Sequence, residues 1–493
     1  MTMELSKARE YEEKYRNLIP KEERPAYHLS APIGWLNDPN GFSVYRGEYH
    51  LFFQYHPYSA TWGTMHWGHA KTKDFIRWVF LPAALAPDMP YDREGCFSGS
   101  AVEMPDGRQL LCYTGISSTQ DESGFIRNVQ QQCIAVGDGR DYEKYEGNPV
   151  LSKEDLPEGC SIYDFRDPKI WREGDEYRMI VSSRLFDGNG GALIFKSLDG
   201  LKWTFVSTLL EGRGEIGRMW ECPDYFRLDD EEILLISPME MMPKGLMYHA
   251  GYGNVCIFGH MDPVTGRFLK SSMQPVDYGL DFYAMQTTES MDGRRIMIAW
   301  MQNWETSSNR RRDLRLAGEM TIPRELSIKD GMLIQSPVRE IENYYGKPSI
   351  HRQVMLDSAK MSFRDIKGRI LDLQVTIYSG EEQPFTAFRV YVAEDSENAV
   401  TIRYKPSKHT IRIDRSRCSF AYDIVNAREF NVREIDGKIK LRILLDRHSM
   451  ELFVNDGEQT ATSLIYAPAD AQGISFESEG MAVMDVEAHE LSV

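Results

Sequence analysis

The chain has 493 residues, of which 42% are hydrophobic and 11% aromatic, so it can build packed cores and is not a disordered protein. This length favours two domains. The formal net charge of −17 disfavours nucleic acid and anionic membranes as partners, because both are bound through clustered positive charge. A neutral small molecule is the better match.

The first 29 residues form a charged segment that predicts an N-terminal helical extension. This segment lacks the apolar stretch of a signal peptide, and no later run is long and apolar enough for a membrane span. The seven cysteines are odd in number and contain no Cys-x-x-Cys pair. This pattern indicates reduced thiols and a cytoplasmic location.

A hairpin pattern then recurs along the chain roughly every 60 residues. Its first copy joins the strand-like runs 41–45 and 49–53 through a Gly turn, and further turns of this kind lie at 105–107, 173–175, 228–231 and 291–293. A second type of turn, an Asp followed by an aromatic residue, falls between successive copies, so each unit is expected to hold four strands. Five such units predict a five-bladed β-propeller over residues 30–335, with a large β-sandwich as the alternative.

Three of the five predicted units open with an acid that is followed by proline within two positions. These acids are Asp38, Asp167 and Glu221, and the inner strands of a propeller would bring them together near its axis. Each acid alone could serve a turn or an ion pair. Three in register point to function, because like charges that share one channel cost energy. Two carboxylates in a cleft are the minimum requirement for glycoside hydrolysis.

Sugar sites also need aromatic faces and hydrogen-bonding side chains, and the sequence places several near the acids. The candidates for substrate binding are Trp35, Asn37, Gln54, Trp62, Phe97, Ser98 and Trp300.

Two further features invite a different chemistry. His66 and His69 could suggest a metal, but no third ligand is near in the sequence, and we expect them to pack or to lie at a rim. Cys222 lies beside Glu221 without an evident His or Asn partner, so we expect a small residue that tunes the surroundings of the acid. No metal and no cofactor are predicted.

Beyond the repeat, residues 336–349 read as a linker with a short helix. In residues 350–493 strands alternate between apolar and polar positions, as at 387–392 and 441–446, which is typical of an antiparallel β-sandwich. The predicted fold class is therefore all-β, a five-bladed β-propeller followed by a C-terminal β-sandwich.

Four segments resemble the signatures of glycoside hydrolase family 32, the family of invertases, sucrose-6-phosphate hydrolases, inulinases and levanases. They are WLNDPNG at 35–41, FSGSA at 97–101, FRDPK at 165–169 and WECPD at 220–224. Shorter matches at 54–57, 62–70, 321–327 and 454–458 extend the resemblance over nearly the whole chain.

The resemblance implies a β-fructofuranosidase that retains the anomeric configuration. Asp38 would be the nucleophile, and Glu221 would be the general acid and base. Asp167, oriented by Arg166, would stabilise the oxocarbenium-like transition state. Substrates would be sucrose, sucrose 6-phosphate or short fructo-oligosaccharides.

Three alternatives are weighed at this point. They are a transfructosylating enzyme, an inverting glycosidase of a related propeller fold, and a non-catalytic carbohydrate-binding propeller. The motifs and the sandwich argue against the second, and the presence of all three acids argues against the third. Recognition of a 6-phosphate would need a basic group at the pocket rim, for which Lys244, Arg310 and Arg311 are candidates. The sandwich edges offer a surface for a homo-oligomer.

Overall fold

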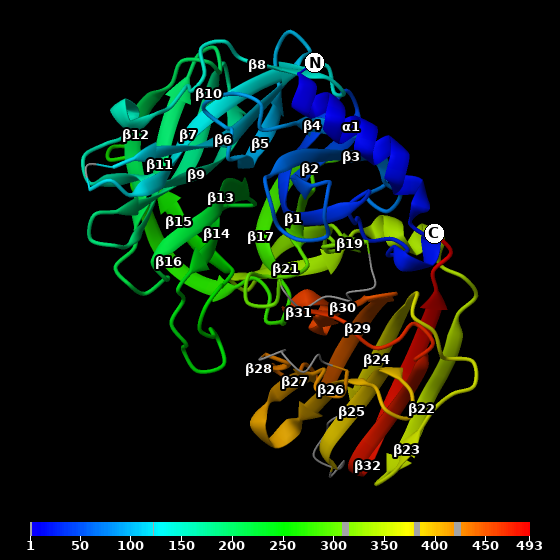
Figure 1. The fold of residues 1–493 in the computed structure, drawn as a ribbon. Helices are drawn as coiled ribbons and strands as arrows, with labels where there is room; N and C mark the ends of the chain where they lie inside the picture. The colour runs from blue at the N-terminus through cyan, green and yellow to red at the C-terminus, as the bar shows by residue number, and fades with distance from the viewer. Residues whose placement is uncertain (1, 122, 308–314, 379–384, 419–424) are drawn as a thin grey trace.

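The computed structural model describes residues 2–121, 123–307, 315–378, 385–418 and 425–493. Figure 1 shows two β-rich parts side by side: a ring of small sheets coloured blue to yellow-green, and a second part coloured yellow to red. Among the helices of the described residues, none is long and apolar enough to span a membrane.

The ring consists of five sheets with four consecutive antiparallel strands each, apart from one added strand described below. The predicted five-bladed propeller is confirmed. Blades one and two contain β1 (Gly34–Tyr45), β2 (Glu48–His56), β3 (His66–Thr72), β4 (Val79–Leu85), β5 (Gly95–Glu103), β6 (Gln109–Gln120), β7 (Ile126–Gly137) and β8 (Tyr142–Lys144). A short 3-10 helix, η3 (Lys153–Asp155), precedes blade three. Blades three to five contain β9 (Cys160–Glu173), β10 (Glu176–Leu185), β11 (Gly190–Ser197), β12 (Thr204–Glu211), β13 (Met219–Leu228), β14 (Glu231–Met239), β15 (Val255–Met261), β16 (Phe268–Pro275), β17 (Tyr283–Glu289), β18 (Arg295–Trp300), β20 (Arg324–Lys329) and β21 (Met332–Pro337).

The added strand, β19 (Leu316–Ala317), joins the last blade to the first. It pairs in parallel with the start of β1, with Leu316 opposite Gly34. Gly318 follows at a φ of +90°, and a Cβ there would lie 1.9 Å from the backbone oxygen of Leu36. Only glycine permits this approach, so the chain closes its ring through a glycine.

The inner strand of every blade is interrupted by a bulge near its beginning. The register shifts fall between Leu36 and Pro39, Phe97 and Gly99, Arg166 and Lys169, Glu221 and Asp224, and Tyr283 and Gln286. Three residues in these bulges, Asp167, Cys222 and Ala284, adopt positive φ angles of 65°, 49° and 55°. Bulges re-aim side chains, and strained backbone of this kind clusters at functional sites.

The second part is the predicted β-sandwich, which is confirmed. Its long strand β32 (Gly473–Glu490) takes part in both sheets: its first half pairs with β25, and its second half pairs with β22 and β24. The other elements are β22 (Ser349–Asp357), β23 (Lys360–Met361), β24 (Leu371–Tyr378), β25 (Phe385–Glu394), β26 (Val400–Lys405), η5 (Pro406–Lys408), β27 (Thr410–Asp414), β28 (Ala427–Asn431), β29 (Lys438–Asp446), β30 (Ser449–Val454), η6 (Asn455–Gly457) and β31 (Gln459–Leu464).

Helical segments lie where the sequence predicts them. The N-terminal segment contains α1 (Met3–Tyr15), η1 (Arg16–Leu18) and η2 (Lys21–Glu23), and η4 (Arg339–Tyr344) connects propeller and sandwich. The helix α1 packs on β4, where Arg9 Nε donates to Ala83 O (2.9 Å) and Ala83 N donates to Glu12 Oε2 (3.0 Å). The domain boundaries drawn after residues 29, 335 and 349 stay predictions.

A buried network of charges joins propeller and sandwich. Arg324 at the start of β20 donates through Nη2 to Glu451 Oε2 on β30 (2.6 Å) and through Nη1 to Asp277 Oδ2 (3.0 Å). His28 lies between Glu451 Oε1 (2.8 Å) and Asp446 Oδ2 (2.9 Å). All five side chains are buried. Burying any one of these charges without a partner would strongly destabilise the fold, and the attraction between the paired charges offsets this desolvation cost.

Candidate active site

A cavity of about 280 Å³ lies between the first halves of the propeller's inner strands, close to the roughly 300 Å³ at which ligand pockets begin. Its lining consists of Asn37, Asp38, Gln54, Trp62, Phe97, Ser98, Arg166, Asp167, Glu221 and Trp304. A second cavity of about 390 Å³ at the other end of these strands is lined by none of Asp38, Asp167 and Glu221. The three predicted acids therefore share the smaller cavity.

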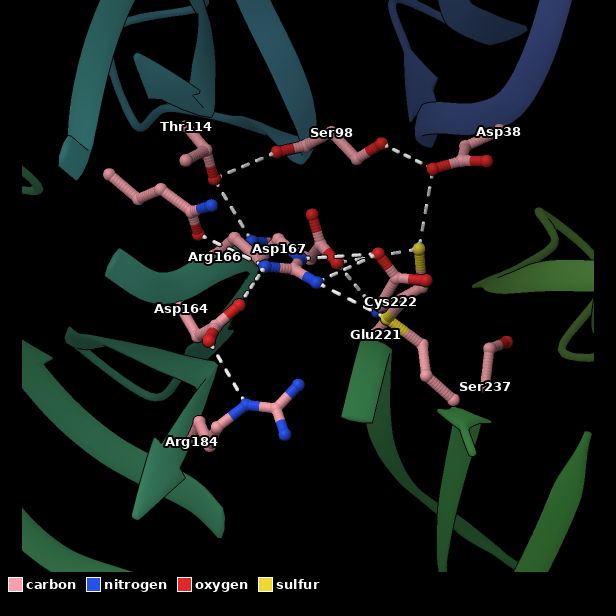
Figure 2. A network of polar contacts seen from close by, with 12 residues as sticks. Asp38, Ser98, Thr114, Asp164, Arg166, Asp167, Arg184, Glu221, Cys222 and Ser237 are labelled. Carbon is pink, nitrogen blue, oxygen red and sulfur yellow. Dashed lines mark hydrogen bonds and ion pairs between the residues drawn. The ribbon is translucent and has the colours of Figure 1, made fainter. Parts of the chain in front are cut away.

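Asp38 on β1 is held through both carboxylate oxygens, and Figure 2 shows the contact with Ser98. Ser98 Oγ on β5 donates to Oδ2 (2.7 Å), and Asn37 Nδ2 donates to Oδ1 (3.0 Å). Burial raises the pKa of Asp38, and the negative charge of Glu221 adds to this effect, while the two hydrogen bonds oppose it. The result is a pKa of about 6. The ionised form therefore dominates above that pH, and its orientation is fixed.

Asp167 on β9 is positioned by the neighbouring blades. Its backbone N–H donates to Thr114 Oγ1 (2.9 Å), and its Oδ2 accepts the backbone N–H of Cys222 (2.9 Å). Burial, together with the carboxylates of Glu221 and Asp38, raises the pKa of Asp167, while Arg166 opposes this shift.

Cys222 lies between the acids, as Figure 2 shows. Its Sγ is 3.8 Å from both Asp38 Oδ2 and Asp167 Oδ2. Burial and the nearby carboxylates raise the pKa of the Cys222 thiol well above its usual value, so it stays protonated. A neutral thiol can donate weakly to the acids but does not act as a nucleophile.

Glu221 on β13 is held on both sides. Arg166 Nη2 lies 3.1 Å from Glu221 Oε1, and the hydroxyl of Tyr283 on β17 lies 2.6 Å from Oε2. The guanidinium also donates to Asp164 Oδ1 (2.9 Å), Gln130 Oε1 (3.3 Å) and Met239 Sδ (3.4 Å). Arg166 was expected to orient Asp167. Its guanidinium instead hydrogen-bonds to Glu221, and it acts on Asp167 through its positive charge.

Three aromatic side chains, Trp62, Phe97 and Trp304, line the cavity. Trp62 is 50% exposed, and its ring packs edge-on against Phe97 at a centroid distance of 6.3 Å. Trp304, which was not among the predicted binding residues, lines the cavity as well. Such faces suit the apolar C–H surfaces of a sugar ring.

Two predicted sugar-binding residues do not line the cavity. Trp300 is fully buried on β18, and Trp35 is 2% exposed and donates through Nε1 to Asn37 Oδ1 (2.8 Å). The rings of the two residues pack against each other, and Trp300 supports Trp304 edge-on at 5.1 Å. Each of the two rings lies one layer behind a residue that lines the cavity, so neither faces it, and direct substrate contact by either stays an untested prediction.

The remaining candidates lie as follows. Gln54 lines the cavity and donates through Nε2 to Cys96 O (3.0 Å). Lys244 is exposed and is not part of the cavity lining, and Arg310 and Arg311 lie outside the described residues.

His66 and His69 have separate partners. His66 Nδ1 contacts Thr64 O (3.0 Å), whereas His69 Nε2 contacts His50 Nδ1 (2.9 Å) and its ring stacks on Phe52. Among the described residues, no group of three His, Cys, Asp or Glu side chains could hold a metal ion.

Two family models cover most of the chain. "Glycosyl hydrolases family 32 N-terminal domain" matches residues 28–337, and "Glycosyl hydrolases family 32 C terminal" matches residues 340–492. The chain belongs to glycosyl hydrolase family 32. The family predicted from the four signature segments, and with it a glycosidase, is confirmed.

Individual members of the family are similar over nearly their whole length. A sucrose-6-phosphate hydrolase of Zymomonas mobilis is 36% identical over 487 residues, covering 95% of this chain and 92% of the relative. A raffinose invertase of Escherichia coli is 36% identical over 471 residues, covering 93% of both chains. Among solved structures, the Bombyx mori GH32 beta-fructofuranosidase superposes with a TM-score of 0.84 at 33% identity, covering 99% of this chain and 97% of that one. A mutant of the same enzyme has been solved in complex with sucrose, with a TM-score of 0.82.

Proposed function

We propose that this glycosidase is a β-fructofuranosidase that hydrolyses sucrose-type substrates with retention of configuration. The observation that carries the proposal is the convergence of Asp38, Asp167 and Glu221 in one small cavity of a family 32 fold. The sucrose complex of the similar Bombyx mori enzyme supports this substrate class.

In the first step, the carboxylate of Asp38 attacks C2 of the fructosyl unit while Glu221 donates its proton to the departing glycosidic oxygen. The C2–oxygen bond breaks, and a fructosyl ester forms on Asp38. In the second step, Glu221 removes a proton from water, the water oxygen bonds to C2, and the ester bond to Asp38 breaks. Asp167 hydrogen-bonds ring hydroxyls and opposes the positive charge that develops on the sugar.

The hydroxyl of Tyr283 can hydrogen-bond to Glu221 both when Glu221 is protonated and when it is ionised. It lies 2.6 Å from Glu221 Oε2 and 3.0 Å from the backbone oxygen of Ser237, but it has only one proton to donate. When Glu221 is protonated, it can donate to Tyr283, which then donates to Ser237 O. When Glu221 is ionised, Tyr283 can turn and donate to the carboxylate, so both states keep a hydrogen bond.

The experiment is hydrolysis of sucrose followed by NMR of the first anomer released, together with kcat/KM for sucrose, sucrose 6-phosphate, kestose and inulin. We expect β-fructofuranose first and a higher kcat/KM for the disaccharides than for inulin. Release of the α-anomer would exclude the double displacement. Fructosylated sugars formed at high sucrose would measure transfer to sugar in place of water.

Two further aspects belong to the proposal. A cytoplasmic location is supported by the seven cysteines, all of which are free thiols. A homo-oligomer remains a prediction, which analytical ultracentrifugation tests.

A further inference from the structure

The turn at residues 302–307 carries Trp304 to the cavity and is fixed by its neighbours. The side-chain oxygen of Asn303 accepts the backbone N–H groups of Glu305 (2.9 Å) and Thr306 (3.1 Å), while its Nδ2 donates to Leu280 O (3.0 Å). Thr306 Oγ1 donates to Asp281 Oδ1 (2.8 Å). The turn therefore depends on the segment just before β17.

Asp281 connects this turn to the sandwich. Its second oxygen, Oδ2, is ion-paired with Arg415 Nη1 and accepts the backbone N–H of Leu464 (2.8 Å), and both of these residues belong to the sandwich. Asp281 and Arg415 are fully buried. One carboxylate thus holds the cavity wall through Oδ1 and the second domain through Oδ2.

The backbone of the sandwich reinforces the same connection. The edge strand β31 accepts the N–H groups of Leu280 (2.8 Å) and Asp281 (3.1 Å) at Thr462 O, which covers an otherwise unpaired edge. At Gly279 a Cβ would lie 2.1 Å from the backbone of Thr462. Any larger residue would push β31 away from the segment that supports Trp304.

A second sandwich arginine reaches the turn, with Arg428 Nη2 lying 3.9 Å from Glu305 Oε2. The sandwich thus reaches two neighbouring residues of the turn, Glu305 directly through Arg428 and Thr306 through Asp281.

We propose that Arg415 is a positioning residue for the cavity: its ion pair with Asp281 fixes the turn that places Trp304 against the substrate. The inference rests on the proposed function, because it is measured through substrate hydrolysis. Trp304 lines the cavity as an aromatic wall and is not one of its acids, so its displacement weakens substrate and transition state alike. Loss of such uniform binding raises KM and leaves kcat nearly unchanged.

The test compares Arg415→Met with Arg324→Met, two fully buried arginines that each pair across the domain interface. We expect both variants to lower Tm. Only Arg415→Met should raise KM for sucrose, by about fivefold or more, with kcat within about twofold of wild type. Trp304→Ala should raise KM by roughly tenfold, and adding Arg415→Met to it should change KM little further, because both changes remove the same wall.

Thr306→Val supplies a variant that leaves the interface arginine intact, should Arg415→Met fail to fold. It removes the Thr306 hydroxyl, and with it the hydrogen bond to Asp281 (2.8 Å) and the longer one from Asn303 N–H (3.4 Å), and is expected to reproduce the rise in KM. An unchanged KM in folded Arg415→Met or Thr306→Val, or multiplicative effects of Arg415→Met and Trp304→Ala, would overturn the inference. If the wild-type enzyme does not hydrolyse sucrose, the proposed function fails instead.

Discussion

Single hydroxyl groups contact the cavity acids, and the hydrogen bond from Ser98 to Asp38 offers the cleanest test of their effect. Its hydrogen bond to Asp38 Oδ2 favours the ionised carboxylate, while burial and Glu221 raise the pKa of Asp38 to about 6. In Ser98→Ala the pKa of Asp38 should rise by roughly one unit, because a hydrogen bond to a charged group contributes about 1.5 kcal/mol or more. The acid limb of kcat/KM should move to higher pH by that amount.

Ser100→Ala is the matched control for Ser98→Ala. Ser100 lies on the same strand, and its hydroxyl contacts only the backbone of Pro168 and Ile170. Its pH profile should keep the wild-type acid limb. An unmoved limb in Ser98→Ala would show that Asp38 does not set it.

Tyr283→Phe tests the hydroxyl beside Glu221. The change removes the hydrogen bond to Oε2 from both protonation states of Glu221, so kcat for sucrose should fall by about tenfold or more. Tyr248→Phe serves as the control, since the buried Tyr248 hydroxyl has no hydrogen-bond partner among the described residues. Equal kcat values in wild type and Tyr283→Phe would remove the proposed role.

The sequence located the three acids because each shares a signal, an acid before proline at the start of a repeat. Tyr283 carries a weaker form of this signal: it opens the fifth unit, but it is neither acidic nor followed by proline. Trp300 and Trp304 could not be separated by sequence, because one layer of packing decides which ring reaches the cavity. Closeness in sequence to the acids indicates which residues lie near the site. It does not indicate which side chains face the cavity, because their direction depends on bulges that the sequence does not reveal.

At the scale of elements, the short strand β19 closes the propeller and depends on Gly318. Gly318→Ala combines a positive φ with a contact of 1.9 Å to Leu36 O, and it should lower the free energy of unfolding by roughly 2–4 kcal/mol. Gly293→Ala has a similar φ of +84° but open space around the added Cβ, so it should cost about 1 kcal/mol. Urea denaturation measures both, and equal losses would argue against ring closure as the cause.

The repeated hairpins were visible in the sequence because turns and strand periodicity are local. Ring closure by β19 was not predicted, since a two-residue parallel pairing between distant segments leaves no periodic pattern. The bulges were not predicted either, because a bulge depends on the register between two paired strands, which the sequence of one strand does not determine.

For the whole molecule, the charge network between propeller and sandwich makes stability depend on pH. Hydrogen bonds and charges of Asp446 and Glu451 raise the pKa of His28 to about 10 despite burial, and His28 in turn holds the pKa of Asp446 well below its usual range. The contribution of His28⁺ is complete below its unfolded pKa near 6.5 and is lost as pH rises towards 10. The contribution of Asp446 is lost below about pH 4.

The variant His28→Gln isolates the first of these effects. The free energy of unfolding of wild type should exceed that of His28→Gln most clearly near pH 6, and the difference should shrink between pH 6.5 and 10. Denaturant titrations at several pH values measure this difference. A gap that stays constant over this range would mean that His28 is not charged in the folded protein.

The central claim is that Asp38 forms a covalent bond to the fructosyl unit, and trapping this adduct tests it most directly. Glu221→Gln should be incubated with a fructosyl fluoride, whose leaving group needs no acid, quenched, digested and analysed by mass spectrometry. Without Glu221 as a base the ester should persist, so the account predicts one fructosyl unit on the peptide that contains Asp38. A fructosyl unit on Asp167, or release of fructose without any adduct on Asp38, would contradict it.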